Sequence, residues 1–130
     1  MLYIGQSQKP GLRKRLRNEL LGVGHGTLFR SLGVALDFYP PRGSLASNTT
    51  SYNFRFSTSD AERIVEWIAA NVEFSYLCLE TPTINASERS AIEHYAPLLN
   101  LRHNPRGDKR VLAEIKARRR EAVMLARNLS

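Results

Sequence analysis

The chain has 130 residues, of which 42% are hydrophobic and 24% are charged, and its formal net charge is +7. This length fits one domain with a real core, and the composition excludes a wholly disordered chain. The positive charge predicts a polyanionic partner, a class that includes nucleic acid, an acidic membrane surface and an acidic protein.

The N-terminal third of the sequence predicts one strand and two helices. Residues 1–4 form a short apolar stretch before a glycine, which is typical of a strand. Leucines recur every fourth residue from 12 to 20, as they do on one face of a helix. Glycines then interrupt this pattern, and Thr27 is expected to cap a second helix that ends near Leu36.

The middle of the chain predicts a loop, a short extended segment and a helix. Residues 40–51 are rich in Pro, Gly, Ser, Asn and Thr, which favours a loop. Phe54 and Phe56 alternate with polar residues, as in a short strand. Thr58 or Ser59 is expected to cap the helix that follows.

The C-terminal part predicts another strand and two more helices. The apolar run at 74–79 is the clearest strand pattern in the chain. A helix is expected to begin at Asn85 or Ser87 and to end before Pro97, and residues 111–129 predict a long basic helix. Because strands and helices alternate, we expect an α/β or α+β fold built on a small sheet.

The positive charge is concentrated at the two ends of the sequence. Residues 1–42 sum to +5, residues 43–100 to −4, and residues 101–130 to +6. This distribution predicts local electropositive surfaces rather than a uniformly cationic chain.

The cysteine content and the apolar stretches bear on the cellular compartment. Cys78 is the only cysteine, so an intramolecular disulfide is excluded, and its apolar neighbours predict a buried structural thiol. No stretch approaches the roughly 20 apolar residues of a membrane span, and the N-terminus lacks the features of a signal peptide. We therefore expect a cytoplasmic protein with no membrane partner.

Glu88 is the first candidate for a functional residue. It shares one face of its expected helix with Ile92 and Tyr95, and a carboxylate in an apolar stripe needs a metal, a cation or backbone donors. A capping box is the other interpretation, in which Asn85 caps the helix and Glu88, three residues later, bonds back to it. Spacing alone leaves both interpretations open.

Arg15 and Tyr3 are the other candidates. Arg15 lies at the edge of the leucine face, where its guanidinium could reach into a cleft and bind a phosphate. It also belongs to a run of basic residues, which is more typical of a solvated helix face. Tyr3 ends the first expected strand, where a phenol can act as a base beside a cation or can simply be a core residue with its hydroxyl paired.

These residues occur in an order that resembles the GIY-YIG nucleases. Leu2-Tyr3-Ile4-Gly5-Gln6-Ser7, followed by Gly11-Leu12-Arg13-Lys14-Arg15-Leu16-Arg17, is similar to the second half of the signature and its arginine helix. Glu88 stands twelve residues before Asn100, and Pro97 lies between them, as in the family's glutamate helix and its closing Pro-x-x-Asn segment.

The resemblance covers roughly residues 1–105, which we expect to form a nuclease domain. The family's Gly-Ile-Tyr strand is not among these 130 residues, and Gln6 stands where many members have lysine. Residues 106–130 are expected to form a basic helix that packs on the domain or extends from it. The fold implied by the resemblance is a small antiparallel sheet flanked by helices.

The resemblance also implies a chemistry and a set of roles. Glu88 would hold a divalent metal, Mg²⁺ or Mn²⁺, and Arg15 would bind the phosphate. Tyr3 would be one of two active-site tyrosines, and Asn100 would support the site. One metal and one arginine stabilise the charge that grows on phosphorus, and a tyrosine near the metal can activate the attacking water.

The function that follows is a metal-dependent endonuclease of a bacterial type, acting on double-stranded or branched DNA. The side chains expected to contact nucleic acid are basic, namely Arg13, Lys14, Arg17, Arg30, Arg118 and Arg119. The alternative function is a catalytically degenerate module that binds nucleic acid without cutting it.

Overall fold

The computed structural model describes residues 1–9, 11–45 and 53–127, and its regular elements are all helical. In chain order they are α1 (Leu12–Leu20), α2 (Thr27–Ala35), α3 (Thr58–Asn71), the 3-10 turn η1 (Thr81–Thr83), α4 (Ile84–Tyr95) and α5 (Lys109–Arg127). Part of the loop expected at 40–51, residues 46–51, lies outside the described residues.

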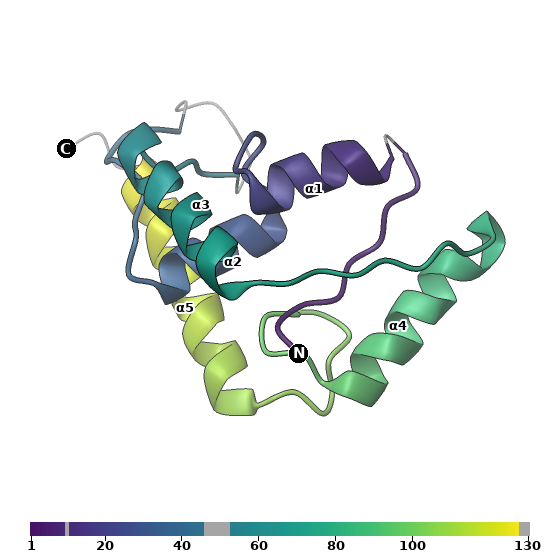
Figure 1. The fold of residues 1–130 in the computed structure, drawn as a ribbon. Coiled ribbons are helices and arrows are strands. Elements are labelled where there is room, and N and C mark those ends of the chain that lie inside the picture. The colour runs from purple at the N-terminus through teal and green to yellow at the C-terminus, as the bar shows by residue number, and fades with distance from the viewer. Residues whose placement is uncertain (10, 46–52, 128–130) are drawn as a thin grey trace.

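Helix α2 is the centre of the core, and α1, α3 and α5 pack around it (Figure 1). Every residue from 28 to 34 is buried, so this helix is covered on all sides, as its largely apolar sequence requires. Gly33 permits close contact between α2 and the segment at 54–56, because an added Cβ at Gly33 would lie 2.3 Å from the ring of Phe56. Helix α5 contributes Ile115 and Ala122 to the same core.

The expected helices are confirmed within the described residues, with small differences at their ends, and the last two residues of the helix expected at 111–129 lie outside them. Helix α1 follows Gly11, whose φ of 103° favours glycine. Its C-cap residue is Leu21, and Gly22, the expected C-cap, follows it in the left-handed conformation. The side chain that caps α3 is Ser57 rather than Thr58 or Ser59. Helix α2 has no side-chain cap from its own N-cap residue, which is a glycine.

The expected antiparallel sheet is wrong: within the described ranges there is no strand, and the fold is all-α. Four hydrogen bonds join residues 1–4 to residues 98–100. Two of them come from the side chain of Asn100 rather than from the backbone of a neighbouring strand. The segment at 54–56 is likewise held by side chains, since Arg30 donates to the carbonyl of Phe54 and His25 accepts from the amide of Phe56.

The segment at 74–79 departs most from its expected strand. It runs as a long extended trace from α3 to η1 (Figure 1), and the described part of the chain gives its backbone no hydrogen-bond partner. Its side chains are all exposed, including Leu77 at 78%, and Cys78 is exposed rather than buried. Alternating apolar residues favour an extended backbone, but a strand exists only where a second strand pairs with it.

Helix α4 stands apart from the core. Among the described helices it contacts only η1, which directly precedes it (Figure 1). Polar side chains from residues 6 and 8 and the segment at 96–100 connect it to the rest of the molecule. In the described residues, no helix is long and apolar enough to span a membrane.

Candidate active site

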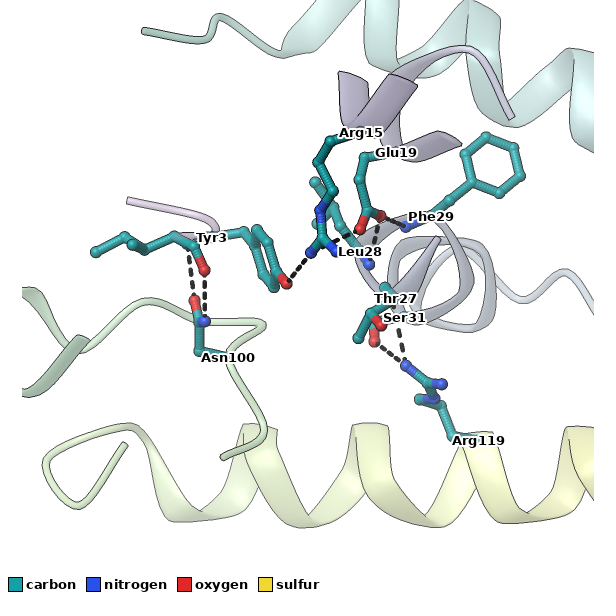
Figure 2. Close-up of polar contacts among 10 residues, drawn as sticks. Tyr3, Arg15, Glu19, Thr27, Leu28, Phe29, Ser31, Asn100 and Arg119 are labelled. Atoms are coloured by element: carbon teal, nitrogen blue, oxygen red, sulfur yellow. Dashed lines mark hydrogen bonds and ion pairs between the residues drawn. The ribbon is translucent and has the colours of Figure 1, made fainter. Parts of the chain in front are cut away.

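Asn100 fixes the N-terminal segment in place. Its side chain is buried, its Nδ2 donates to the carbonyl of Ile4 at 2.8 Å, and its Oδ1 accepts from the amide of Ile4 at 2.8 Å. The amides of Leu98 and Leu99 donate to the carbonyls of Met1 and Leu2. One side-chain amide thus provides the pair of bonds that a neighbouring strand would give, and it holds the residue next to Tyr3 (Figure 2).

Tyr3 and Arg15 meet through their functional groups. Nη2 of Arg15 donates to the hydroxyl of Tyr3 at 3.2 Å, although the two residues come from the first segment and from α1 (Figure 2). Gly5 leaves room for this contact, because an added Cβ would lie 2.8 Å from the Tyr3 ring and 3.5 Å from Nη2 of Arg15. The side chain of Arg15 therefore contacts Tyr3 while remaining 37% exposed.

Burial raises the pKa of Tyr3 above its usual value of 10. The guanidinium of Arg15 opposes that rise in the pKa, and the carboxylates of Glu19 and Glu88 add to it. The phenol therefore keeps its proton at neutral pH.

Glu88 bonds to the N-terminal loop rather than to its own helix. Nε2 of Gln6 donates to Oε2 of Glu88 at 2.8 Å and to Oδ1 of Asn85 at 2.7 Å. The capping-box interpretation is wrong, because the N-cap position of α4 is Thr83 and no side chain caps that end. Gln6 thus brings α4 to the same short segment that carries Tyr3.

A hollow of about 320 Å³ lies between this loop and α1, and its lining is formed by Gln6, Ser7, Gln8, Lys9, Arg15 and Asn18. The lining is polar and holds two cationic side chains, which suits a phosphate group. In the described ranges there is no group of three His, Cys, Asp or Glu side chains that could hold a metal.

The basic residues expected at a nucleic-acid surface fall into two sets. Arg13, Lys14 and Arg17 are exposed on α1, the helix that carries Arg15. They form a cationic surface beside the hollow, whose own lining includes Lys9.

The other three arginines contact the protein itself. Arg30 is only 7% exposed, and burial, reinforced by the charge of Arg119, lowers its pKa to about 10. Arg118 bonds to Asp37 and Glu114. Arg119 reaches from α5 to the start of α2, where its Nη1 donates to Oγ of Ser31 at 2.9 Å and to a backbone carbonyl (Figure 2).

Glu19 is a buried residue at this site that the sequence patterns did not single out. Its side chain is 4% exposed. One carboxylate oxygen lies 3.0 Å from Nη2 of Arg15 on the same helix, and the other accepts from the amide of Leu28 at the start of α2. A signal was present in the sequence, because an acid four residues after an arginine in a basic helix is typical of an ion pair. The contact of Gln6 with Asn85 and Glu88 had no local signal, since about 80 residues separate them.

Comparison with known protein families gives a match over most of the chain. A protein-family model described as "GIY-YIG catalytic domain" matches residues 1–121. The matched range contains Tyr3, Arg15, Glu88 and Asn100 and extends well into α5. No curated protein and no solved structure matches the chain.

Proposed function

The chain belongs to the GIY-YIG family, and from this membership we propose that it is a divalent-cation-dependent endonuclease that hydrolyses phosphodiester bonds in DNA. The family membership supports a nuclease-type function, and the geometry of the site supports the finer assignment.

The convergence of four residues on one short segment carries the proposal. Arg15 bonds to the hydroxyl of Tyr3, Asn100 holds the backbone of Ile4, and Glu88 is bonded by Gln6. Three distant parts of the sequence thus reach residues 3–6, which adjoin the polar hollow. A phosphate in this hollow would meet Arg15 and Lys9, with the hydroxyl of Tyr3 bonded to that arginine and Glu88 bonded to Gln6 of the lining.

Each side chain has a role that its chemistry supports. Hydrolysis of a phosphodiester adds water to phosphorus and breaks one P–O bond, so negative charge grows on the phosphate oxygens. Arg15 would bind that charge with the N–H groups that are not used by Tyr3. Tyr3, which holds its proton at neutral pH, would relay the proton of the attacking water, accepting it at its hydroxyl oxygen while its own proton leaves to solvent. Asn100 would keep the segment that carries Tyr3 in place.

The donors near Glu88 fit a hard divalent cation. Its carboxylate and the amide oxygen of Asn85 are hard oxygen ligands, and Mg²⁺ commonly binds one or two carboxylates together with water and substrate phosphates. Such a cation would lower the pKa of the attacking water. Its positive charge would also offset the effect of the carboxylates, which raise the pKa of Tyr3.

A second candidate function is a binding module without catalysis. The observation that favours it is the bond from Gln6 to Glu88, which already pairs the carboxylate within the protein. The exposed cations of α1 would still bind DNA, with an affinity that falls as salt displaces phosphate contacts.

Incubation with supercoiled plasmid tests the proposal. The full chain should nick and then linearise the plasmid with Mg²⁺ or Mn²⁺, and EDTA should stop the reaction. Tyr3→Phe, which keeps the ring beside Gly5 and loses the hydroxyl, should bind plasmid as the parent does and cleave it far more slowly. DNA binding that weakens with salt, with no cleavage by the parent protein under either metal, would establish the binding module instead.

A further inference from the structure

Glu19 has a carboxylate that contacts two elements at once. Its Oε2 accepts from the amides of Leu28 at 2.8 Å and Phe29 at 3.2 Å, which belong to the first turn of α2. Its Oε1 lies 3.0 Å from Nη2 of Arg15, close enough for an ion pair although not aligned as a hydrogen bond (Figure 2).

The bond to α2 makes Glu19 a rigid anchor. Helix α2 is the buried centre of the molecule, and its N-terminal amides favour a negative charge. Gly26, the N-cap residue, has no side chain for this purpose, and an added Cβ there would lie 2.3 Å from the Glu19 carboxylate. The glycine therefore admits a carboxylate that comes from another helix.

The ion pair with Arg15 transmits this anchoring to the candidate active site. The same nitrogen, Nη2 of Arg15, lies 3.0 Å from Glu19 and 3.2 Å from the hydroxyl of Tyr3. Within the described part of the chain, Nε and Nη1 of Arg15 have no hydrogen-bond partner, and Arg15 lines the hollow. One end of the guanidinium is thus fixed, and the rest is available to a ligand.

Glu19 also balances the positive charge of neighbouring arginines. Its carboxylate acts on the pKa values of Arg30 and Arg119 in the direction that keeps them charged, while burial acts in the opposite direction. A carboxylate at this depth is favourable only because helix amides and cations surround it.

Resting on the proposed nuclease function, we propose that Glu19 is a positioning residue that holds the guanidinium of Arg15 beside Tyr3, so that its remaining N–H groups meet the phosphate. It does not touch the substrate and acts through Arg15. A misplacement of about 1 Å at a catalytic group can cost on the order of a hundredfold in rate, so such an anchor is valuable to a nuclease.

The variant Glu19→Gln separates the positioning of Arg15 from the bonds that Glu19 makes to the first amides of α2. Its amide oxygen can still accept from the amides of Leu28 and Phe29, while its NH₂ group would face Nη2 of Arg15, donor against donor. We expect plasmid cleavage by the full chain with Mg²⁺ to fall by about ten- to a hundredfold, with DNA affinity close to that of the parent. Ile64→Val, a mild core change away from the site, controls for a general loss of stability.

A double-mutant cycle with Arg15→Ala decides how Glu19 acts. If Glu19 acts through Arg15, adding Glu19→Gln to Arg15→Ala should cause no further loss of cleavage. Losses that multiply in the double variant, or a loss that Ile64→Val reproduces at equal stability, would overturn the proposal.

Thermal unfolding gives a readout that does not depend on cleavage. Glu19→Gln should lower the melting temperature of the parent but raise that of Arg15→Ala, because it removes a buried charge that has lost its cation. Equal shifts in the two backgrounds would show that Glu19 and Arg15 are not coupled, and would overturn the proposal even if the parent cleaves DNA. If the melting temperatures show coupling but the parent protein does not cleave plasmid, the pairing of Glu19 with Arg15 stands. The nuclease function, and with it the catalytic role of Glu19, would then be refuted.

Discussion

Replacing Glu88 with glutamine should separate folding from cleavage. Oε2 of Glu88 accepts one bond of 2.8 Å from Gln6, and the side chain is half-buried on a helix that stands apart from the core. A glutamine oxygen can accept the same bond, so the change replaces a charged acceptor with a neutral one. That difference is about 1 kcal/mol or less in the free energy of unfolding. It corresponds to a shift of at most roughly 3 to 5 °C in the melting temperature.

The effect on a divalent cation should be much larger. Glu88 is the carboxylate that would bind the ion, and neutral amides are poor ligands for Mg²⁺. Loss of a group that only supports a metal ligand already costs about ten- to a hundredfold, so we expect Glu88→Gln to lower plasmid cleavage by at least about a hundredfold. It should also abolish any rise in melting temperature on addition of Mg²⁺.

Glu93→Gln is the matched control, because Glu93 is exposed on the same helix and should tolerate the change. Cleavage and melting temperature should be measured for the parent and both variants, with and without Mg²⁺. If Glu88→Gln cleaves as the parent does, or keeps the parent's response to Mg²⁺, the assignment of Glu88 as the metal ligand is refuted.

Three further predictions concern the other parts of the site and the core. Arg15→Ala should lower plasmid cleavage about a hundredfold, the cost of one transition-state donor, and should lower the free energy of unfolding by about 1 to 3 kcal/mol because buried Glu19 loses its cation. Arg13→Ala, on the exposed surface of the same helix, should do much less to either quantity, and equal effects would contradict the inward placement of Arg15. Asn100→Ala removes two bonds of 2.8 Å and should cost about 1 to 3 kcal/mol in urea unfolding; an unchanged midpoint would mean that these bonds do not hold the N-terminal segment. Burial and nearby arginines lower the pKa of His25 to about 4. Between that pH and about 6.5, the unfolded chain therefore binds a proton that the folded chain does not. The free energy of unfolding should be at its full value above about pH 6.5 and should fall by up to about 3 kcal/mol as the pH drops to about 4. His25→Asn keeps an acceptor and suits the positive φ of this position, so it should lose less stability over that range, and an equal loss would rule out His25 as the source.

The helices were predictable because their signals are local. The leucine spacing of α1 and the glycine at each of its ends are properties of about a dozen neighbouring residues, and the structure places the helix where they indicate. The cap of α2 was not predictable in this way. Thr27 was the local candidate, but the side chain that bonds the first amides comes from Glu19 on another helix.

The strands failed for a related reason. The alternation at 54–56 and the apolar run at 74–79 specify an extended backbone, and neither specifies what lies beside it. Arg30 and His25 take the place of a partner strand for the first segment, and the described residues provide none for the second. A sheet is a property of pairs of segments, so a pattern within one segment cannot establish it.

The candidate site shows how far motif order reaches. The order of Tyr3, Arg15, Glu88 and Asn100 was enough to suggest the family, and the family model spans all four positions. The contacts that bring them together depend on Gln6, on the backbone of residue 4 and on a hydroxyl facing a guanidinium. These contacts join residues up to 96 positions apart, so spacing along the chain could not supply them.

The exposed segment at 74–79 has a consequence for how the protein behaves in concentrated solution. Its six residues are uncharged, contain neither proline nor glycine, and are rich in the side chains that favour cross-β stacking. Glu73 and Glu80 stand at its two ends, and in an antiparallel pair of copies each would face its counterpart of the same charge. Like charges at both ends of the segment therefore disfavour the pairing of two copies along it.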